Sequence, residues 1–496
     1  MERICMSGCF SIPGEAKISY HMKYKFISIL AVLLVGNSVS AQHYSAFNGS
    51  DKFGSLSVYN NPSSIVNTPY KWDLTLFGTQ FTAISNALRG KNFPFYASPK
   101  SKFSIANGNY ARNADINYNI KLFNARYSIN KNQAIAFGIN FKGYTQASSS
   151  RINYNDSIKG ALSFLSFNEH DRILHVRLAG SAWMELYGTY GFTFLNNETG
   201  KLTGGATLKI MRGMAGVFAS ADDVGIEKSS GGDPTVYNIL NGNARYGYSS
   251  NLGDGSSFSG ADLFSHSRTG FAVDLGVEYI IKTQAVTSVY DQENEKNNYE
   301  WKAGFALLDL GSNQFQFGSQ SRHISSLKDN TTGSVFQDKF YSVKNFALFN
   351  DSIATIVNDA KQLSGTFNVA NPARAVINVD HYISGNFYVN GELSFNLVSG
   401  KNTNNIVVKE SNLITITPRW ESKKFGFYAP VQFTQHGNFW IGGAIKAGPL
   451  LIGTHNLLNI FSNSQYLSGG AYLALILRPS GFIKDPHNRQ YDCPQY

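Results

Sequence analysis

Alternation of apolar and polar residues at every second position dominates the chain, and it is clearest in residues 374–434. From Phe387 onward, one series of alternate positions is mainly apolar and the other is polar, with Asn390 and Glu392 in the polar series. A period of two indicates a β-strand whose two faces meet different surroundings. Aromatic-rich runs of about ten residues are typical of transmembrane barrel strands, with lipid outside and a polar lumen inside. A large soluble sandwich would show the same alternation.

The same alternation recurs on both sides of this stretch, and we count about fourteen strands in all. The strands expected outside residues 374–434 lie near 72–76, 116–122, 135–141, 271–282, 301–307, 439–447, 450–456 and 466–478. Long polar loops are expected at 147–171 and 229–262, and a polar insertion at 319–370 with a helix near 352–363. No repeat of about 40 to 50 residues is present, which disfavours a propeller. The predicted fold class is therefore all-β, a transmembrane antiparallel β-barrel.

The strand at 271–282 shows the alternation without interruption. Its apolar series starts at Phe271, and its other series contains Asp274, Glu278 and Lys282. A soluble sandwich would turn these charges to solvent, whereas a barrel places them in the lumen, where they can pair. We therefore predict a set of lumen-facing residues and a set of interfacial tryptophans. The lumen-facing candidates are Asp274, Glu278, Lys282, Asn390 and Glu392, and the tryptophans are Trp72, Trp301, Trp420 and Trp440.

Residues 42–70 precede the first strand and lack the alternation. Asn60 and Asn61 stand before Pro62, and a residue before proline is driven out of the helical region, so this tripeptide marks a turn that starts a short helix. We expect this segment to fill the lumen as a hatch, with Asn60, Asn61 and Pro62 as its candidate residues. The alternative is a disordered leader on the periplasmic side.

The beginning of the chain predicts export. Lys23 and Lys25 precede an apolar run at 26–35, and small residues follow up to Ala41, which is the pattern of a secretory signal peptide cleaved near Ala41. We therefore divide the chain into an upstream extension with signal peptide (1–41), hatch (42–70), barrel (71–478) and periplasmic tail (479–496). Of the three cysteines, only Cys493 lies beyond the expected cleavage site, so no intramolecular disulfide is expected in the mature chain.

The composition suits a barrel better than an enzyme or a nucleic-acid-binding protein. Aromatic residues make up 14% and charged residues 15% of the chain, and the net charge of +10 is scattered, so no nucleic-acid partner is expected. Mean hydropathy is −0.20, which disfavours a helical membrane protein. No nucleophile elbow, metal motif or cysteine pair is present, so we predict no enzyme activity, metal or cofactor.

Three stretches carry a resemblance to a known family. They are Asn60-Asn61-Pro62; residues 270–279 followed by Leu308-Asp309-Leu310-Gly311; and residues 418–430 followed by Gly448-Pro449-Leu450. Together they resemble uncharacterised outer-membrane barrels of Bacteroidota, which look like the long-chain fatty-acid transporter (FadL-like) barrels and the related type IX secretion shuttle. The resemblance implies a fourteen-stranded barrel with an N-terminal hatch. It implies no chemistry.

These observations predict an outer-membrane barrel of a Gram-negative bacterium, in contact with lipid. We expect a hatch-gated conduit or binding protein for a hydrophobic or small solute. The competing hypothesis is a non-transporting scaffold that holds secretion or surface-assembly proteins. A soluble secreted β-protein is the third alternative.

Overall fold

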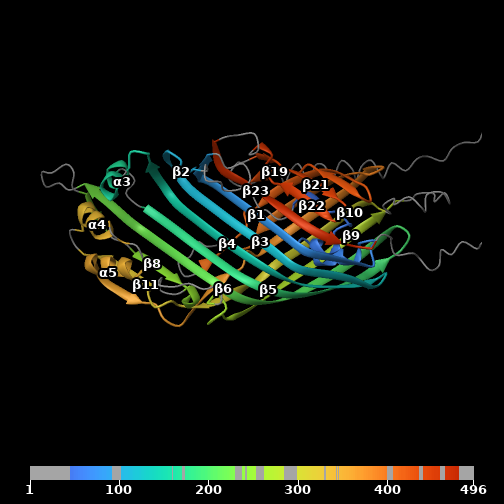
Figure 1. The fold of residues 1–496 in the computed structure, drawn as a ribbon, viewed down its shortest axis with the longest axis horizontal. Coiled ribbons are helices and arrows are strands. Elements are labelled where there is room, and N and C mark those ends of the chain that lie inside the picture. The colour runs from blue at the N-terminus through green and yellow to red at the C-terminus, as the bar shows by residue number, and fades with distance from the viewer. Residues whose placement is uncertain are drawn as a thin grey trace, which may run out of the picture. The chain divides into compact units, whose positions relative to one another are not determined.

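The fold was analysed in a computed structural model of the chain (Figure 1). It describes residues 45–91, 102–158, 160–169, 174–228, 237–240, 243–252, 262–283, 299–328, 331–341, 343, 346–398, 406–434, 439–458 and 464–479. All of these residues belong to one compact unit, Val39–Tyr496. The predicted signal peptide, the cleavage site and Cys493 lie outside the described residues.

The β-strands close into an antiparallel barrel of fourteen strands, three of which consist of two consecutive segments. Neighbours in the chain are neighbours in the wall, and β1 pairs with β23 to close the ring. In wall order the strands are β1 (Trp72–Lys91), β3 (Gly108–Asn130), β4 (Gln133–Tyr154), β5 (Leu174–Asn196), β6 (Gly200–Lys228), β9 (Thr269–Lys282), β10 (Tyr299–Gln316), β13 with β14 (Thr366–Ala370, Arg374–Ser384), β15 (Phe387–Asn396), β17 (Leu413–Glu421), β18 with β19 (Phe425–Tyr428, Val431–Thr434), β20 with β21 (Phe439–Ile441, Gly443–Ala447), β22 (Leu450–Thr454) and β23 (Ser464–Leu477).

The two ends of the barrel differ. At one end the strands are joined by short turns, as between β3 and β4 or β14 and β15, and we call it the short-turn end. At the opposite, long-loop end, the additional helices and strands gather (Figure 1). They are β2 (Lys102–Ile105), α3 (Ala161–Phe167), β7 (Tyr237–Leu240), β8 (Asn243–Tyr248), η3 (Ser250–Leu252), β11 (Arg322–Leu327), α4 (Gly333–Phe340), α5 (Phe346–Ile356), β12 (Val357–Gln362) and β16 (Ile406–Val407).

The two faces of the wall have the polarity that a lipid-embedded barrel requires. Large apolar side chains point outward; Phe271 and Leu208 are 67% and 68% exposed. Charged and amide side chains point inward and are buried, among them Asp274 and Asn390, each at 0% exposure. Because a soluble sandwich would have the reverse arrangement, the predicted β-barrel is confirmed.

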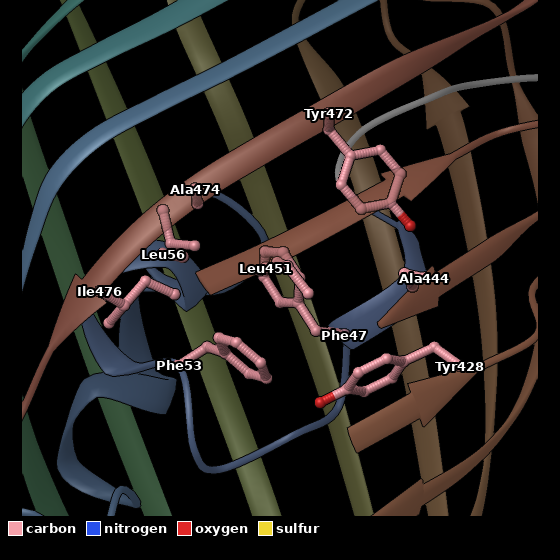
Figure 2. Close-up of a cluster of buried hydrophobic side chains, with 10 residues drawn as sticks. Phe47, Phe53, Leu56, Tyr428, Ala444, Leu451, Tyr472, Ala474 and Ile476 are labelled. Carbon is pink, nitrogen blue, oxygen red and sulfur yellow. The ribbon is translucent and has the colours of Figure 1, made fainter. Parts of the chain in front are cut away.

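The N-terminal segment (residues 45–70) packs against the inner face of the wall at the short-turn end. It contains η1 (Ser45–Phe47), α2 (Gly54–Ser57) and η2 (Pro62–Val66). Phe47, Phe53 and Leu56 form one apolar contact with inward-facing residues of the last wall strands, such as Leu451 and Tyr472 (Figure 2). Val58, Tyr59, Ile65 and Val66 form a second with Ala134, Ala136 and Tyr187 of β4 and β5. The segment therefore spans the lumen between two sides of the wall.

Several local predictions were wrong. The helix expected at 352–363 is α5, which ends at Ile356, and β12 follows it because residues 357–362 pair with β11. The loop expected at 147–171 contains the end of β4 and all of α3, since β4 continues pairing with β3 as far as Tyr154. Trp440 is buried inside the barrel, because its neighbours Phe439 and Ile441 occupy the outward positions.

No helix in the described part of the chain is long and apolar enough to cross a membrane.

Candidate functional site

Asn61 and Pro62 of the N-terminal segment rest on a row of glycines in the wall. Gly191, Gly205 and Gly276 are direct partners across β5, β6 and β9. A Cβ atom on Gly276 would lie 2.1 Å from Asn61 Oδ1, and one on Gly205 would lie 2.5 Å from the Pro62 carbonyl carbon and oxygen. No side chain fits there, so the row forms a bare floor for η2.

Asn61 is anchored at this floor by its side chain. Its Oδ1 accepts from the Ser63 backbone N–H (3.0 Å) and caps η2, while its Nδ2 donates to the Val277 carbonyl (3.0 Å). The sequence prediction that Asn61-Pro62 starts a short helix is confirmed. Two of the three stretches that carry the family resemblance, Asn60-Asn61-Pro62 and residues 270–279, thus touch each other in the folded chain.

Four arginines of the barrel donate to backbone carbonyls of the N-terminal segment. Arg126, which is 1% exposed, donates to the carbonyls of Ile65 (2.8 Å) and Tyr70. The other three donate to single carbonyls: Arg374 to Tyr59 (3.0 Å), Arg419 to Gly49 (3.4 Å) and Arg478 to Lys52 (3.1 Å). Charge-assisted donors of this kind satisfy buried carbonyls that make no secondary-structure bond, so they hold the segment in a single position.

Carboxylates of the wall bind the side chains of the same segment. Glu392 Oε2 accepts from Asn48 (2.7 Å) and from Asn60 (2.9 Å), and Glu278 Oε1 accepts from Asn67 (2.6 Å). Asn390 lies beside Glu392 and donates to Asn378 (3.0 Å). These two wall carboxylates therefore position the N-terminal segment rather than line an open channel.

Tyr59 connects the N-terminal segment to the centre of the lumen. Its hydroxyl donates to Asn124 (2.5 Å) or Asn140 (2.7 Å), and the Lys121 ammonium lies 3.0 Å from its ring centroid. Burial, and to a smaller extent repulsion from neighbouring Tyr187, raises the pKa of Tyr59 well above its usual range. The hydroxyl therefore stays neutral and acts as a donor. Asn140 in turn donates to Glu185 (2.9 Å).

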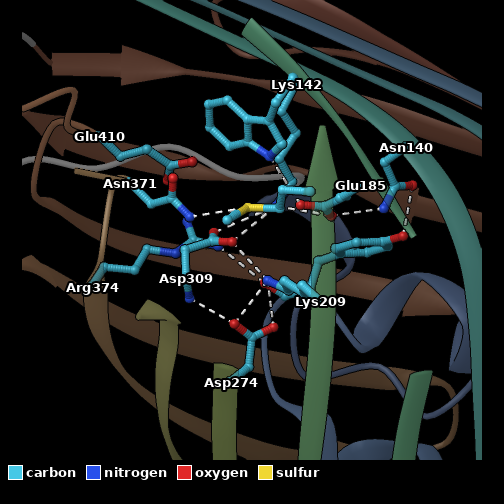
Figure 3. Close-up of polar contacts among 12 residues, drawn as sticks. Asn140, Lys142, Glu185, Lys209, Asp274, Asp309, Asn371, Arg374 and Glu410 are labelled. Carbon is cyan, nitrogen blue, oxygen red and sulfur yellow. Dashed lines mark hydrogen bonds and ion pairs between the residues drawn. The ribbon is translucent and has the colours of Figure 1, made fainter. Parts of the chain in front are cut away.

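An ionic layer lies in the lumen next to Tyr59, whose ring centroid is 5.8 Å from the Lys142 ammonium (Figure 3). Lys142 lies 3.2 Å from Glu185 and 3.1 Å from Asp309, and Lys209 lies 2.6 Å from both Asp274 and Asp309. Arg374 pairs with Glu410 at the edge of this layer. Because buried charges of opposite sign are directly paired, the layer is a stable part of the barrel interior rather than a site with an unmet charge.

Asp309 reaches the layer through a distortion of β10. Its φ is +55°, and the register between β9 and β10 shifts between Leu307 and Leu310. A Cβ atom on Gly311 would lie 2.1 Å from the Phe271 carbonyl oxygen, so only glycine permits this bulge. The Leu308-Asp309-Leu310-Gly311 stretch is therefore the sequence signature of a bulge that turns one carboxylate into the lumen.

An apolar cluster fills the lumen between the ionic layer and the long-loop end. Its aromatic residues include Trp183, stacked on Tyr144 at 5.5 Å, and Phe218 and Phe315, which contact Phe367 at 5.4 and 5.5 Å. The full cluster consists of Tyr144, Trp183, Met211, Phe218, Ala272, Phe315, Phe367, Val369, Ile406 and Val408. Buried aromatic and aliphatic surface of this kind is the feature that an apolar solute would recognise.

The cavity between the N-terminal segment and the wall is small and polar. Its volume is about 20 Å³, and its lining includes Asn60, Asn61, Glu278 and Lys302. Such a space holds about one water molecule. It is unsuited to an apolar ligand.

The structure brings the predicted residues together to different extents. Asn60, Asn61 and Pro62 lie in the lumen, as do Asp274, Glu278, Asn390 and Glu392. Lys282 does not join them, because it sits at the end of β9 and bonds to Asn196 (2.8 Å) and Asn197 in the turn between β5 and β6. Sequence reasoning missed Tyr59, Asp309, Arg374 and the glycine row. The family resemblance alone gave a signal, through the Asp309 stretch and through residues 270–279, which contain Gly276.

Among the described residues, no group of three or more histidine, cysteine, aspartate and glutamate side chains could hold a metal ion. Asp380 and His381 point to opposite faces: Asp380 pairs with Arg419 inside, while His381 stacks on Trp301.

Comparison with known proteins gives one family and several barrels. A model for a family of unknown function (DUF5723) matches residues 62–455. No curated protein matches the sequence. Among solved structures, a Pseudomonas aeruginosa FadL homologue is 10% identical, with 89% of this chain and 97% of that chain covered and a TM-score of 0.39. The Ralstonia pickettii toluene transporter TbuX is 11% identical (89% and 98% covered, TM-score 0.39), and the P. putida toluene transporter TodX is 10% identical (88% and 94% covered, TM-score 0.34).

Proposed function

This chain belongs to the DUF5723 family of unknown function, and we propose that it is an outer-membrane barrel that admits a small hydrophobic solute, with its N-terminal segment as a hatch. The proposal places the short turns on the periplasmic side and the long loops outside the cell, as in other outer-membrane barrels. Residues 42–70 would form the hatch and residues 71–478 the barrel.

The observation that carries the proposal is how the N-terminal segment sits in the lumen. It packs inside the short-turn end through hydrogen bonds and apolar contacts, with η2 seated on Gly191, Gly205 and Gly276. At the glycine floor no side chain of the wall interlocks with η2, so release of the segment requires the hydrogen bonds from the arginines and glutamates to break but no side chain to move out of the way. Noncovalent closure of this kind is reversible, which a gate requires.

The apolar cluster supports a hydrophobic solute over an ion or a sugar. Trp183, Phe218, Phe315 and Phe367 offer aromatic surface on the long-loop side of the ionic layer. A polar solute would lose its hydration there without gaining hydrogen bonds, whereas an apolar solute would gain from leaving water.

One observation favours the competing scaffold function. The described lumen is occupied at two levels, by the N-terminal segment and by the apolar cluster, and the charges of its ionic layer are paired. A barrel that only presents its loops to secretion or surface-assembly proteins would need no passage. Permeability separates the two functions.

The test is to force the N-terminal segment out of the lumen by giving the glycine floor a side chain. In Gly205→Val the new side chain would collide with the Pro62 backbone, which cannot rotate away as a side chain can. We expect cells with this variant to take up radiolabelled toluene at least about threefold faster than cells with the wild type, because an apolar solute, unlike an ion, can still pass the apolar cluster. In cells, we expect the wild type to raise accumulation of radiolabelled toluene above a vector control.

Gly188→Val is the matched control. Gly188 lies on β5, the neighbour of the β6 strand that carries Gly205, but a Cβ atom there would meet nothing within 4 Å. It should behave like the wild type, and heat-modifiable migration in gels would show that both variants retain a folded barrel. A folded Gly205→Val barrel without faster toluene uptake, together with a wild type that accumulates no toluene, would favour the scaffold.

A further inference from the structure

A short segment from the long-loop end crosses the lumen, and we call residues 406–411 the strap. Its first two residues form β16, which runs parallel to β13 with Val369 opposite Ile406 and Ala370 opposite Val407. Every other strand pairing within the described ranges is antiparallel. A parallel pair in an up-and-down barrel means that the chain has turned back into the barrel after β15.

The far end of the strap reaches strands that are distant in wall order. Gln146 of β4 brackets Lys409: its Nε2 donates to the Lys409 carbonyl (2.8 Å), and its Oε1 accepts from the Lys409 N–H (3.0 Å). Tyr144 donates to Glu410 (2.7 Å), and Ser411 donates to Asp115 of β3 (3.3 Å). Since β3 and β4 are the second and third wall strands and β13 belongs to the eighth, the strap spans the lumen.

The strap fills the apolar cluster with its own side chains. Ile406 and Val408 are 9% and 1% exposed and belong to the cluster with Trp183, Phe218 and Phe367. The remaining cluster residues come from wall strands. The two strap side chains contribute about seven carbon atoms of apolar volume, which is close to one monoaromatic ring with a methyl group.

The strap is held by fewer contacts than the wall strands it lies between. Its described anchors include the bracket from Gln146, the bonds of Glu410 to Tyr144 and Arg374, and one backbone bond from Val408 to the Ala370 carbonyl (3.2 Å). Two further bonds join it to wall strands: Asn396 donates to the Glu410 carbonyl (3.1 Å), and Ser411 donates to Asp115 (3.3 Å). The pairing of β16 with β13 involves only two residues, unlike the long ladder between β5 and β6. It can therefore break locally while the barrel stays intact.

We propose that the space occupied by Ile406 and Val408 is the binding site for a small apolar solute, and that the strap is its resident competitor. The solute binds by displacing the strap from the wall of Trp183, Phe218, Phe315 and Phe367. This inference rests on the proposed transport function and deepens it, because it names the site and the size of the solute. It also explains why no empty apolar cavity is needed for binding.

The test locks the strap to the wall. A disulfide between Ala370→Cys and Val407→Cys joins two direct strand partners, whose spacing suits a disulfide, in a chain with Cys5, Cys9 and Cys493 replaced by serine. Bromobenzene is the probe, because its heavy atom quenches tryptophan and Trp183 lines the site. The barrel is held in lipid nanodiscs, so lipid partition is the same in the oxidised and reduced forms.

We expect saturable quenching in the reduced form and at least about a fivefold weaker affinity in the oxidised form. Quenching should also lose its saturable part in Trp183→Phe. In the doubly substituted Ile406→Ser, Val408→Ser chain, the competitor loses its apolar side chains, and affinity should rise about tenfold. A control disulfide between Ala303→Cys and Val379→Cys, partners in two adjacent wall strands, should leave affinity unchanged.

Equal saturable quenching in the oxidised and reduced forms would overturn the proposal, as would quenching that follows lipid partition alone. Failure of this inference can be told apart from failure of the transport function. If cells accumulate toluene to the same level with the strap locked or free, transport stands and the strap proposal falls. If cells with the wild-type protein accumulate none, the transport function falls irrespective of bromobenzene binding.

Discussion

The N-terminal segment and the strap both occupy the lumen, but they are held in different ways. The segment packs on two sides of the wall and has carbonyls bound by four arginines. The strap has two buried apolar side chains, one ion pair and the bracket from Gln146. The anchors of the segment are spread along residues 48–70, whereas those of the strap lie within six residues and include only two residues of strand pairing, so the strap needs less local opening. The two ends of one lumen therefore need different triggers to open.

Arg126→Met should produce the largest difference between the N-terminal segment and the strap in the free energy of local opening. It leaves two carbonyls of the N-terminal segment, those of Ile65 and Tyr70, without their buried donor. An unsatisfied buried group costs about 1–3 kcal/mol, so the free energy of opening of the segment should fall by about 3 kcal/mol. Hydrogen exchange in residues 60–70 should accelerate roughly a hundredfold, while exchange in the strap stays unchanged.

Arg151→Met is the control for Arg126→Met, because Arg151 lies exposed near the long-loop end of β4. It should leave exchange in residues 60–70 at the wild-type rate. Equal acceleration in the segment and the strap after Arg126→Met would mean that the two closures open as one unit.

A smaller effect is expected in the ionic layer that lies between the closures. Asp309→Asn removes the carboxylate shared by Lys142 and Lys209, and the unfolding free energy in guanidinium should fall by about 2 kcal/mol. Asn tolerates the positive φ at this position, so Asp309→Leu should cost more, because it adds backbone strain to the lost charge.

The exposed Asp156 supplies the control substitution Asp156→Asn, which should change the unfolding free energy by less than about 0.5 kcal/mol. If Asp309→Leu and Asp309→Asn were equally stable, the argument that the bulge demands a residue tolerant of positive φ would be wrong.

Gln146→Ala should act on the strap alone. It removes the amide that brackets Lys409, worth about 1 kcal/mol, so exchange in residues 406–411 should accelerate about fivefold. Residues 60–70 should keep their wild-type exchange, which is the reverse of the pattern expected for Arg126→Met. An unchanged strap would show that Glu410 and the apolar contacts hold it without Gln146.

Sequence reasoning predicted the wall better than the contents of the lumen. The period of two in β14, β15 and β9 identified both faces of each strand, because lipid and polar interior impose opposite side chains at successive residues. Trp440 was misplaced because an aromatic residue type says nothing about its phase in the alternation. The breaks after Tyr428 and Ile441 were also missed, since apolar positions continue across them.

The closures depend on pairs that no local pattern encodes. Gly205 and Gly276 are required because Pro62 and Asn61 pack directly against them. The two glycines lie more than a hundred positions from Asn61 and Pro62 in the chain. Sequence reasoning did not single out the strap, since a run of three apolar residues before β17 is too short to show periodicity. Long-range contacts inside a lumen therefore require the folded chain.

The smallest predicted effect tests whether the two closures communicate. Arg374 pairs with Glu410 of the strap and donates to the Tyr59 carbonyl (3.0 Å) of the N-terminal segment. Glu410→Gln keeps the shape and an acceptor for Tyr144 but removes the charge, so strap exchange should rise severalfold and exchange near Tyr59 only about twofold. The second effect arises because the Arg374 side chain is held less rigidly without the Glu410 carboxylate, which weakens its hydrogen bond to the Tyr59 carbonyl. A double-mutant cycle with Arg374→Met should give a coupling of about 1 kcal/mol measured at Tyr59. A coupling of zero would mean that a solute displacing the strap leaves the hatch closed, and that opening the short-turn end requires a separate signal from the periplasmic side.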